Sequence, residues 1–326
     1  MRTIAFFNNK GGVGKTTLAY HCAHMLAEKG YRCLAADLDP QANLTSMSLP
    51  EEKLESMYER ENDRETLNTG LKPLDKGIGD IDRVPIHHVA ERLGLLAGDL
   101  DLSLFEDKLS YHWGKCNDGD EASFRITSAI HRILQREAIE YQADFCLVDV
   151  GPNLGSLNRA TLIACDQVVV PMGADLFSLQ GLKNLGERLE RWRREWQARR
   201  GSFTPSDFSL PEKDFRPMGY VLMQQGMKES RPVKSYRRWA DRIPEVFRRN
   251  VLHSTEPSSE DIEHDHHCLA MIRHYHSLAP MAMEARKPIF NLKPADGAIG
   301  AHYQSVRSAY EVFERLVERL VAHSIP

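Results

Sequence analysis

A glycine-rich loop between an apolar strand and a helix is the feature that most constrains how this chain folds. Residues 10–17 read Lys-Gly-Gly-Val-Gly-Lys-Thr-Thr. A short apolar strand at residues 3–8 precedes the loop, and apolar residues at helical spacing over residues 16–29 follow it. Glycines let the backbone curl close to an anion, and a helix carries about half a positive charge at its N-terminus. The order strand, loop and helix therefore predicts a site for phosphate groups in an α/β fold.

Individual loop residues are expected to make separate contacts with ATP and Mg²⁺. Residues 14–16 complete the pattern G-x-x-x-x-G-K-S/T. Asn9 stands where the first glycine of that pattern is usual, so the loop is a variant. We expect Lys15 to contact the β and γ phosphates, the Thr16 hydroxyl to bind Mg²⁺ and Thr17 to donate to the α phosphate. The residues expected to bind the nucleotide are Gly11, Gly12, Val13, Gly14, Lys15, Thr16 and Thr17.

Apolar runs and amphipathic stretches alternate along the rest of the chain. We expect further strands at residues 32–36, 93–97, 145–148, 167–171, 218–223 and 287–292, and helices at 126–141, 179–200 and 303–322. This alternation predicts a doubly wound, mostly parallel sheet flanked by helices, in a single domain over residues 1–326. Residues 50–83 are rich in charge, glycine and proline, and we expect an inserted segment there that is irregular or partly helical.

Composition restricts the class of protein. Hydrophobic residues make up 42% of the chain, but no apolar run approaches the roughly 18 residues that a membrane span needs. The chain starts directly with a strand and shows no secretory signal pattern, so we expect a cytoplasmic protein without membrane attachment. Its six cysteines form no Cys-x-x-Cys pair and lie mostly in apolar stretches, which predicts buried, reduced thiols.

Several further segments resemble the ParA/MinD family of deviant Walker A P-loop ATPases, which act as dimers. The loop begins with an extra lysine, Lys10, as in the family signature K-G-G-x-G-K-T-S/T. Residues 36–43 resemble the family's D-x-D-P-Q-x-N segment, and residues 147–155 resemble its Walker B region. Residues 166–171, 178–182 and the pair at 287–288 also match, so the resemblance covers nearly the whole chain. The ParA, or partitioning, branch is closer than MinD, because the D-P-Q-x-N and S-L-x-G-L stretches are typical of DNA-segregating and cargo-positioning members.

The resemblance implies roles for four charged residues outside the glycines. Asp39 would orient the attacking water, and Asp37 would support the Mg²⁺ shell. Asp149 ends a buried strand, where a carboxylate can hold Mg²⁺ through water. Lys10 would reach the phosphates of a partner subunit, so that Lys10, Lys15 and Asp39 form the catalytic set. Simple capping of the following turns is the alternative for the aspartates.

The implied reaction is hydrolysis of ATP and water to ADP and phosphate, slow and stimulated by a partner. The implied partners are a second copy of the chain, joined by ATP, and an unidentified protein that stimulates hydrolysis or is the cargo. A switch that recruits a protein without binding DNA is one alternative. Another is a MinD-like protein that positions a membrane site, but residues 308–323 mix glutamates with arginines, whereas anionic membranes favour a basic face. Small-molecule ligases and kinases share the P-loop, yet no motif for a second substrate is visible.

A basic, largely helical region is the candidate for DNA binding. Residues 183–250 hold 17 Lys or Arg against 9 Asp or Glu. The candidate contacts to the DNA backbone are Arg191, Arg194, Arg237 and Arg238, and we expect them to be indifferent to base sequence. The alternative is a solvated face in which Glu187, Glu190 and Glu195 pair with arginines while Trp192, Trp196 and Trp239 pack inward.

Histidines gather between residues 253 and 276, near Cys268. Their spacing lacks the framework of a zinc site, so we expect an exposed polar loop there and assign no metal other than Mg²⁺.

Overall fold

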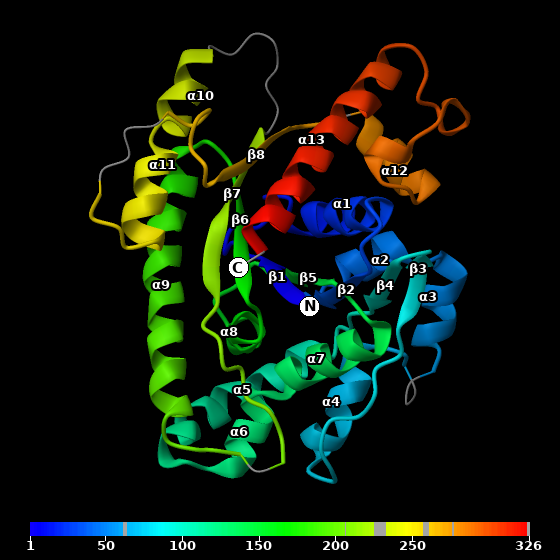
Figure 1. The fold of residues 1–326 in the computed structure, drawn as a ribbon. Coiled ribbons are helices and arrows are strands. Elements are labelled where there is room, and N and C mark those ends of the chain that lie inside the picture. Colours follow the sequence, from blue (N-terminus) through cyan, green and yellow to red (C-terminus); the bar gives the residue numbers. More distant parts are fainter. Residues whose placement is uncertain (61–63, 206, 225–232, 257–260, 276, 325–326) are drawn as a thin grey trace.

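The computed structural model describes residues 1–60, 64–205, 207–224, 233–256, 261–275 and 277–324. Within them, eight strands form one sheet in the order β3-β4-β2-β5-β1-β6-β7-β8 (Figure 1). The strands are β1 (Arg2–Phe6), β2 (Cys33–Leu38), β3 (His87–Ala90), β4 (Leu93–Leu96), β5 (Phe145–Val150), β6 (Gln167–Met172), β7 (Arg216–Gln224) and β8 (Cys268–Arg273). Neighbouring strands are parallel except β3 and β4. The predicted doubly wound, mostly parallel α/β fold is confirmed.

Helices cover both faces of the sheet. One face carries α1 (Lys15–Glu28), α2 (Asn43–Ser48), α3 (Glu51–Tyr58), α12 (Leu278–Ala285) and α13 (Ala301–Ser324). The other carries α4 (Leu67–Lys76), α5 (Leu102–Lys115), α6 (Glu121–Thr127), α7 (Ala129–Tyr141), α8 (Ser156–Ile163), α9 (Leu176–Arg200), α10 (Val233–Ala240), α11 (Ile243–Val246) and the π-helix η2 (Phe247–Val251). Figure 1 shows α1, α12 and α13 together on one side and α4 to α8 on the other.

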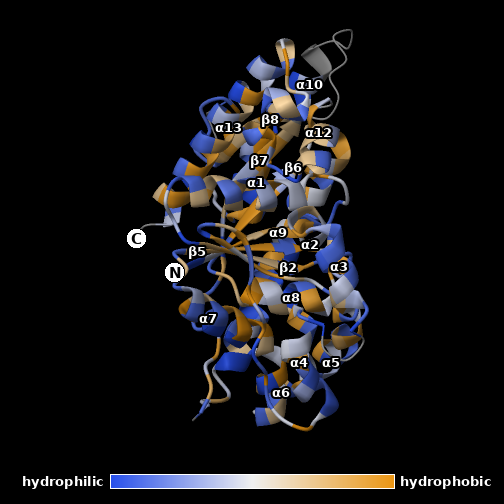
Figure 2. Cartoon of the chain, turned by 90° about the vertical axis from the view of Figure 1, so that its right-hand side faces the viewer, coloured by the Kyte–Doolittle hydropathy of each residue, from blue (hydrophilic) through white to orange (hydrophobic). Residues whose placement is uncertain are grey.

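The central strands are apolar on both sides because each face is covered. In β1, Ile4 and Phe6 join the core under α1 and α13, whereas Ala5 and the next residue after the strand, Phe7, join the core under α8 and α9. Strand side chains alternate between faces, so a strand buried on both sides reads as a continuous apolar run. Figure 2 shows these hydrophobic strands between helices of mixed hydropathy. No helix in the described parts of the chain is long and apolar enough to span a bilayer.

The sheet register brings the predicted site residues to one edge. Asp149 lies opposite Asp37 of β2 on one side and opposite Phe6 of β1 on the other. Because these three strands are parallel, the segments that follow them leave the sheet at the same carboxyl edge. Ligands of open α/β sheets bind at this edge.

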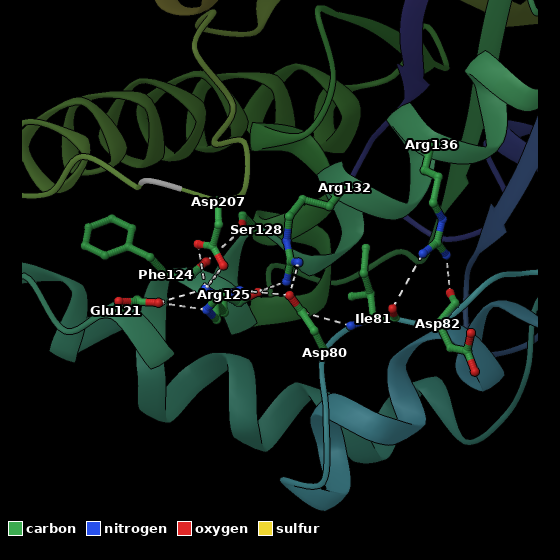
Figure 3. A network of polar contacts seen from close by, with 10 residues as sticks. All are labelled: Asp80, Ile81, Asp82, Glu121, Phe124, Arg125, Ser128, Arg132, Arg136 and Asp207. Atoms are coloured by element: carbon green, nitrogen blue, oxygen red, sulfur yellow. Dashed lines mark hydrogen bonds and ion pairs between the residues drawn. The ribbon is translucent and has the colours of Figure 1, made fainter.

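Residues 50–83 contain α3 and α4, and their end is fastened to the helices beside them (Figure 3). The Asp80 carboxylate accepts hydrogen bonds from Arg132 at 2.7 Å and from Arg125 at 3.0 Å. Arg136 donates to the main-chain carbonyl of Asp82. Leu71 of α4 is buried in the hydrophobic core on this face of the sheet. The segment is therefore held by both apolar packing and ion pairs.

Several elements differ from those expected. The strand predicted at residues 287–292 is wrong, because a 3-10 helix, η3 (Ile289–Asn291), lies there. Ile289, Phe290 and Leu292 all turn into the same core, which a strand with alternating side chains could not do. The predicted helix 126–141 is divided at Ser128 into α6 and α7. Strand β8 and helix α5 were not predicted. All six cysteines are free and buried, as expected.

Candidate functional site

The loop between β1 and α1 has the backbone of an anion site. Gly12 and Gly14 have φ angles of 69° and 82°, in the left-handed region that favours glycine. Gly14 is the N-cap of α1, and its carbonyl accepts the first helical hydrogen bond, from Leu18 at 2.9 Å. A Cβ at Gly14 would lie 2.7 Å from the terminal Cε of the flexible Met223 side chain, which could shift, so the left-handed conformation is the main reason for glycine here. The helix N-terminus is thereby left open toward the loop.

Lys15 lies almost buried inside this loop. Its Nζ donates to the main-chain carbonyl of Lys10 at 3.2 Å, so the ammonium points back into the turn that the loop encloses. Only 7% of the residue is exposed. Burial lowers the pKa of Lys15, while the carboxylates of Asp149 and Asp39 act in the opposite direction. The ammonium therefore faces acidic groups contributed by two neighbouring strands.

Asp149 is a fully buried carboxylate. Neither of its oxygens accepts a hydrogen bond from the described residues, although the Thr16 hydroxyl lies nearby. Burial and the neighbouring Asp37 raise the pKa of Asp149 well above its usual value, and the Thr16 hydroxyl acts in the opposite direction. A buried carboxylate without a partner is costly unless a cation or a donor satisfies it. Oxygen ligands of this kind are those that Mg²⁺ prefers, so the residues fit that ion.

Asp37 and Asp39 have different surroundings. One oxygen of Asp37 accepts from the backbone N–H of Thr45 at 2.8 Å and from its hydroxyl at 2.7 Å, so Asp37 caps the first turn of α2. Burial raises the pKa of Asp37 to about 7, while the hydrogen bonds from Thr45 act in the opposite direction. Asp39 accepts from the N–H of Gln41 at 3.0 Å, and a Cβ at Gly151 would lie 3.3 Å from its carboxylate. Asp39 thus faces the loop after β5, whereas the Asp37 carboxylate is already hydrogen-bonded to Thr45 of α2.

Lys10 contacts the start of α9 in its own subunit. Its Nζ donates to Asp175 at 2.9 Å and to the Ser178 hydroxyl at 3.1 Å. Asp175 is the N-cap of α9 and accepts from the N–H of Ser178. Sequence reasoning did not identify Asp175. The Asp-x-x-Ser pattern before the predicted helix would have indicated a cap, but nothing in the sequence connects this cap to Lys10.

A mainly apolar cavity of about 290 Å³, whose lining also includes Arg273 and His274, adjoins the loop on the side of β7 and β8. Gly14, Thr17, Met223, Ile272 and Tyr275 are among the residues that line it. The loop that would hold phosphates and this cavity share Gly14 and Thr17. A flat apolar group joined to those phosphates would therefore find a wall of apolar side chains within reach.

The basic candidates divide into two groups. On α9, Arg191 pairs with Glu195 at 2.8 Å and Arg194 pairs with Glu190 at 2.6 Å, while Trp192 and Trp196 are buried, as the alternative interpretation expects. On α10, Arg237 is 61% exposed and lies 3.6 Å from Glu263, and Arg238 stacks over Trp239. Arg242 also lies over the Trp239 ring, at 5.3 Å from its centroid.

The histidine-rich stretch has a structural role where it is described. Strand β8 begins at Cys268, within the range expected to be a loop, but it contains no histidine. His253, His264, His266 and His274 are exposed and lie outside any strand, as expected for a polar loop. Asp265 accepts from the Tyr220 hydroxyl at 2.7 Å and thereby ties the stretch to β7. Among the described residues, no group of three or more His, Cys, Asp or Glu side chains is arranged to hold a metal ion. His276 lies outside the described residues.

The sequence model of the AAA_31 family, described as an AAA domain, matches residues 1–199, more than half of the chain. The chain belongs to the ParA/MinD family of deviant Walker A P-loop ATPases. Among the family's named members, the chromosome partitioning protein ParA of Caulobacter vibrioides is 29% identical over 194 residues, which is 59% of this chain and 64% of that protein. The chain spans about half to two thirds of the length of the curated relatives it matches.

Solved structures agree with this ParA-like fold. Protein DIP2308 from Corynebacterium diphtheriae is 24% identical and superposes with a TM-score of 0.74, covering 100% of this chain and 99% of that one. A plasmid partition protein from Borrelia burgdorferi, crystallised with AMPPNP, is 18% identical, with a TM-score of 0.57 and 98% coverage of both chains. At these identities the likeness shows the fold alone.

Proposed function

We propose that this protein is a switch ATPase whose two copies are joined by ATP and separated by hydrolysis. In its ATP-bound dimer it would bind DNA without sequence preference and so segregate or position DNA or another cargo. The observation that carries the proposal is the meeting of three features at one sheet edge. They are the left-handed glycine loop, the ammonium of Lys15 within it, and the partnerless carboxylate of Asp149 beside it.

ATP is the nucleotide that this site suits best. The backbone of residues 11–14 and the N-terminus of α1 would hold the phosphates, with Lys15 turning from the carbonyl of Lys10 onto them. The cavity lined by Met223, Ile272 and Tyr275 would accept the adenine ring. The partition protein from Borrelia burgdorferi with the same fold was crystallised with an ATP analogue, which supports this assignment.

Mg²⁺ would be held by Thr16 and Asp149, partly through water. Asp37 would support the Mg²⁺ shell without binding the ion directly, because its carboxylate already accepts two hydrogen bonds from Thr45 and lies beside Asp149. Bound there, the ion would neutralise charge on the phosphate oxygens.

Asp39 is the residue best placed to orient the attacking water. It is nearly buried, faces the loop after β5 and lies close enough to Lys15 to influence its pKa. Transfer of a phosphoryl group to water depends on positioning and charge stabilisation more than on covalent chemistry. A single carboxylate beside the phosphates therefore suffices for slow hydrolysis, and a partner protein could accelerate it by fixing this geometry.

Lys10 supplies the link between nucleotide and dimer. Its side chain is 40% exposed and lies at the mouth of the loop, whereas Lys15 is buried within it. A flexible ammonium in this position can reach phosphates held by a second copy, where it would stabilise charge in trans. Each site would then be complete only in the dimer.

The surface proposed to contact DNA is formed by the exposed arginines between α10 and η2. They are Arg237 and Arg238 of α10, Arg242 before α11 and Arg249 of η2. Arg191 and Arg194 of α9 remain candidates, but both already pair with glutamates of their own helix, which reduces their attraction for phosphates. The names of the partitioning relatives support DNA as the partner.

One experiment tests the proposal as a whole. DNA binding and dimerisation are measured in the same samples with ADP, ATP and a non-hydrolysable ATP analogue. We expect dimers and DNA binding with ATP and the analogue, and neither with ADP. Dimers without DNA binding would favour the protein-recruiting alternative. Binding to anionic vesicles in place of DNA would favour the membrane alternative.

A further inference from the structure

The lysine proposed to act on a partner's phosphates is held within its own subunit. Lys10 Nζ has three protons to donate, and two are directed at Asp175 and Ser178. These acceptors lie 165 and 168 residues further along the chain, on the first turn of α9. The contact is therefore a tertiary one between the nucleotide loop and the start of this helix.

The acceptor is fixed independently of Lys10. One Asp175 oxygen accepts from the N–H of Ser178 at 2.9 Å, and the other accepts from the Ser178 hydroxyl at 2.6 Å. Burial alone would raise the pKa of Asp175, but the hydrogen bonds from Ser178 and Lys10 outweigh it and the pKa lies below its usual value. The group facing Lys10 is thus a charged carboxylate held by the helix N-terminus.

We infer that Asp175 and Ser178 are positioning residues that retain Lys10 in its own subunit and so restrain dimerisation. This inference rests on the proposed function, in which Lys10 acts on the partner's phosphates. To reach the phosphates of a second copy, as proposed above, the ammonium would have to leave both acceptors of α9. Formation of the dimer therefore includes the breaking of the contact between Lys10 and Asp175.

The ion pair between Lys10 and Asp175 is weak enough for ATP-dependent dimerisation to break it, yet strong enough for its loss to shift the dimerisation equilibrium measurably. The side chains of Lys10 and Asp175 are 40% and 43% exposed, so solvent screens their attraction. Ion pairs of this exposure shift an equilibrium by about two- to fivefold. The first turn of α9 also presents Leu176 and Phe177, which are 45% and 77% exposed, at the same surface. A second copy reaching Lys10 would meet this turn.

Asp175→Asn isolates the restraint from the cap. Asparagine is as good an N-cap as aspartate, so the first turn of α9 is retained while the charge facing Lys10 is removed. Asp120→Asn is a matched control, because Asp120 caps α6 by the same contacts to the N–H and hydroxyl of Ser123. Sedimentation velocity over a series of ATP concentrations gives the concentration at half-maximal dimer for each protein. Thermal unfolding of each variant checks its fold.

We expect Asp175→Asn to lower the ATP concentration at half-maximal dimer by about two- to fivefold, and Asp120→Asn to leave it unchanged. Ser178→Ala, which keeps the Asp175 carboxylate, should shift it less in the same direction and serves if Asp175→Asn does not fold. The double variant Lys10→Ala/Asp175→Asn should not dimerise at lower ATP concentration than Lys10→Ala alone. The inference is overturned if Asp175→Asn and Ser178→Ala both reach half-maximal dimer at the same ATP concentration as the wild type. It is also overturned if Asp120→Asn shifts this concentration as much as Asp175→Asn does. Either result leaves the proposed function intact. Absence of an ATP-dependent dimer in the wild-type protein overturns both.

Discussion

Gly14 is the loop residue with the strictest steric requirement. It has a φ of 82° and forms the N-cap of α1, and a Cβ there would require the end of the Met223 side chain to shift. A left-handed backbone costs a residue with a side chain about 1 to 2 kcal/mol, and displacing Met223 adds to that cost. Gly14→Ala should therefore distort the loop and weaken ATP binding by at least about tenfold, measured by calorimetric titration.

Gly114→Ala is the control for that substitution. Gly114 lies in α5, away from the site, with nothing within 4 Å of an added Cβ. Alanine favours a helix over glycine by up to about 1 kcal/mol, so this variant should be as stable as the wild type or more so, with unchanged ATP binding. Equal ATP affinity in both variants would show that the loop does not need its left-handed glycine.

His21 connects α1 to the C-terminal part of the fold and should make stability depend on pH. Its Nδ1 donates to the Thr17 carbonyl at 2.7 Å, and its Nε2 accepts from the N–H of Ile289 at 3.0 Å, so the ring must be neutral. The ring also stacks on Phe313 at 4.8 Å. Burial lowers the pKa of His21 to about 4, while the hydrogen bond to Thr17 acts in the opposite direction.

The sign of the effect follows from the unfolded pKa of about 6.5. Above that pH the ring is neutral in both states and its contribution to stability is complete. As the pH falls from about 6.5 to about 4, only the unfolded chain takes up the proton, so up to about 3 kcal/mol is lost. Urea unfolding across this range should show a steeper loss in the wild type than in His21→Gln. His88→Gln, at an exposed histidine, should follow the wild type. Parallel curves for wild type and His21→Gln would refute the assignment.

Among the elements, α4 and the segment after it depend on a small ion-pair network (Figure 3). Arg132 is only 7% exposed, and Asp80 is its acidic partner at 2.7 Å. Asp80→Ala would leave this guanidinium buried without its counter-charge, so we expect a loss of about 2 kcal/mol in the free energy of unfolding. Asp75→Ala removes a more exposed ion pair with Lys108 from the same segment and should cost below about 1 kcal/mol. Equal costs in urea unfolding would contradict the network's role.

The arginines of α9 and α10 should differ in their effect on DNA binding. Arg237→Glu/Arg238→Glu should abolish most binding of the ATP form, because it reverses charge on an exposed helix face. Arg191→Glu/Arg194→Glu should reduce binding less, because those arginines are already paired. With three or four phosphates contacted, log K should fall against log salt with a slope of about −3 in the wild type. Fluorescence anisotropy with a random duplex measures both. Equal losses in the two double variants would place the contact elsewhere.

Elements with strong local patterns were predictable, and those defined by distant contacts were not. The strand, glycine loop and helix at residues 2–28 follow from glycine positions and apolar spacing. Strand β8 was missed because the histidine-rich stretch before it obscured its short apolar run. The 3-10 helix at 289–291 depends on the N–H of Ile289 meeting His21, which lies 268 residues away. The cap on α2 by Asp37 and the contact of Lys10 with Asp175 are likewise set by tertiary packing.

At the scale of the whole molecule, one chain forms an ATP site and leaves Lys10 at its mouth. The loop, Asp149 and Asp39 meet at the carboxyl edge of a single sheet. Helix α11 and η2, which follow α10 in the chain, pack against α9, whose first turn contacts Lys10. In the proposed function, the nucleotide state, the association of two copies and the contact with DNA would therefore be connected through few elements. The central claim is that ATP joins two copies through Lys10.

Sedimentation velocity with ATP and Mg²⁺ on wild type, Lys10→Ala and Asp39→Ala tests that claim most directly. The wild type should sediment as a dimer that reverts to monomer as ATP is consumed, because hydrolysis removes the bridging phosphate. Lys10→Ala should bind ATP and remain monomeric. Asp39→Ala should persist as a dimer, since its water is no longer oriented. An unchanged dimer fraction in Lys10→Ala would contradict the account.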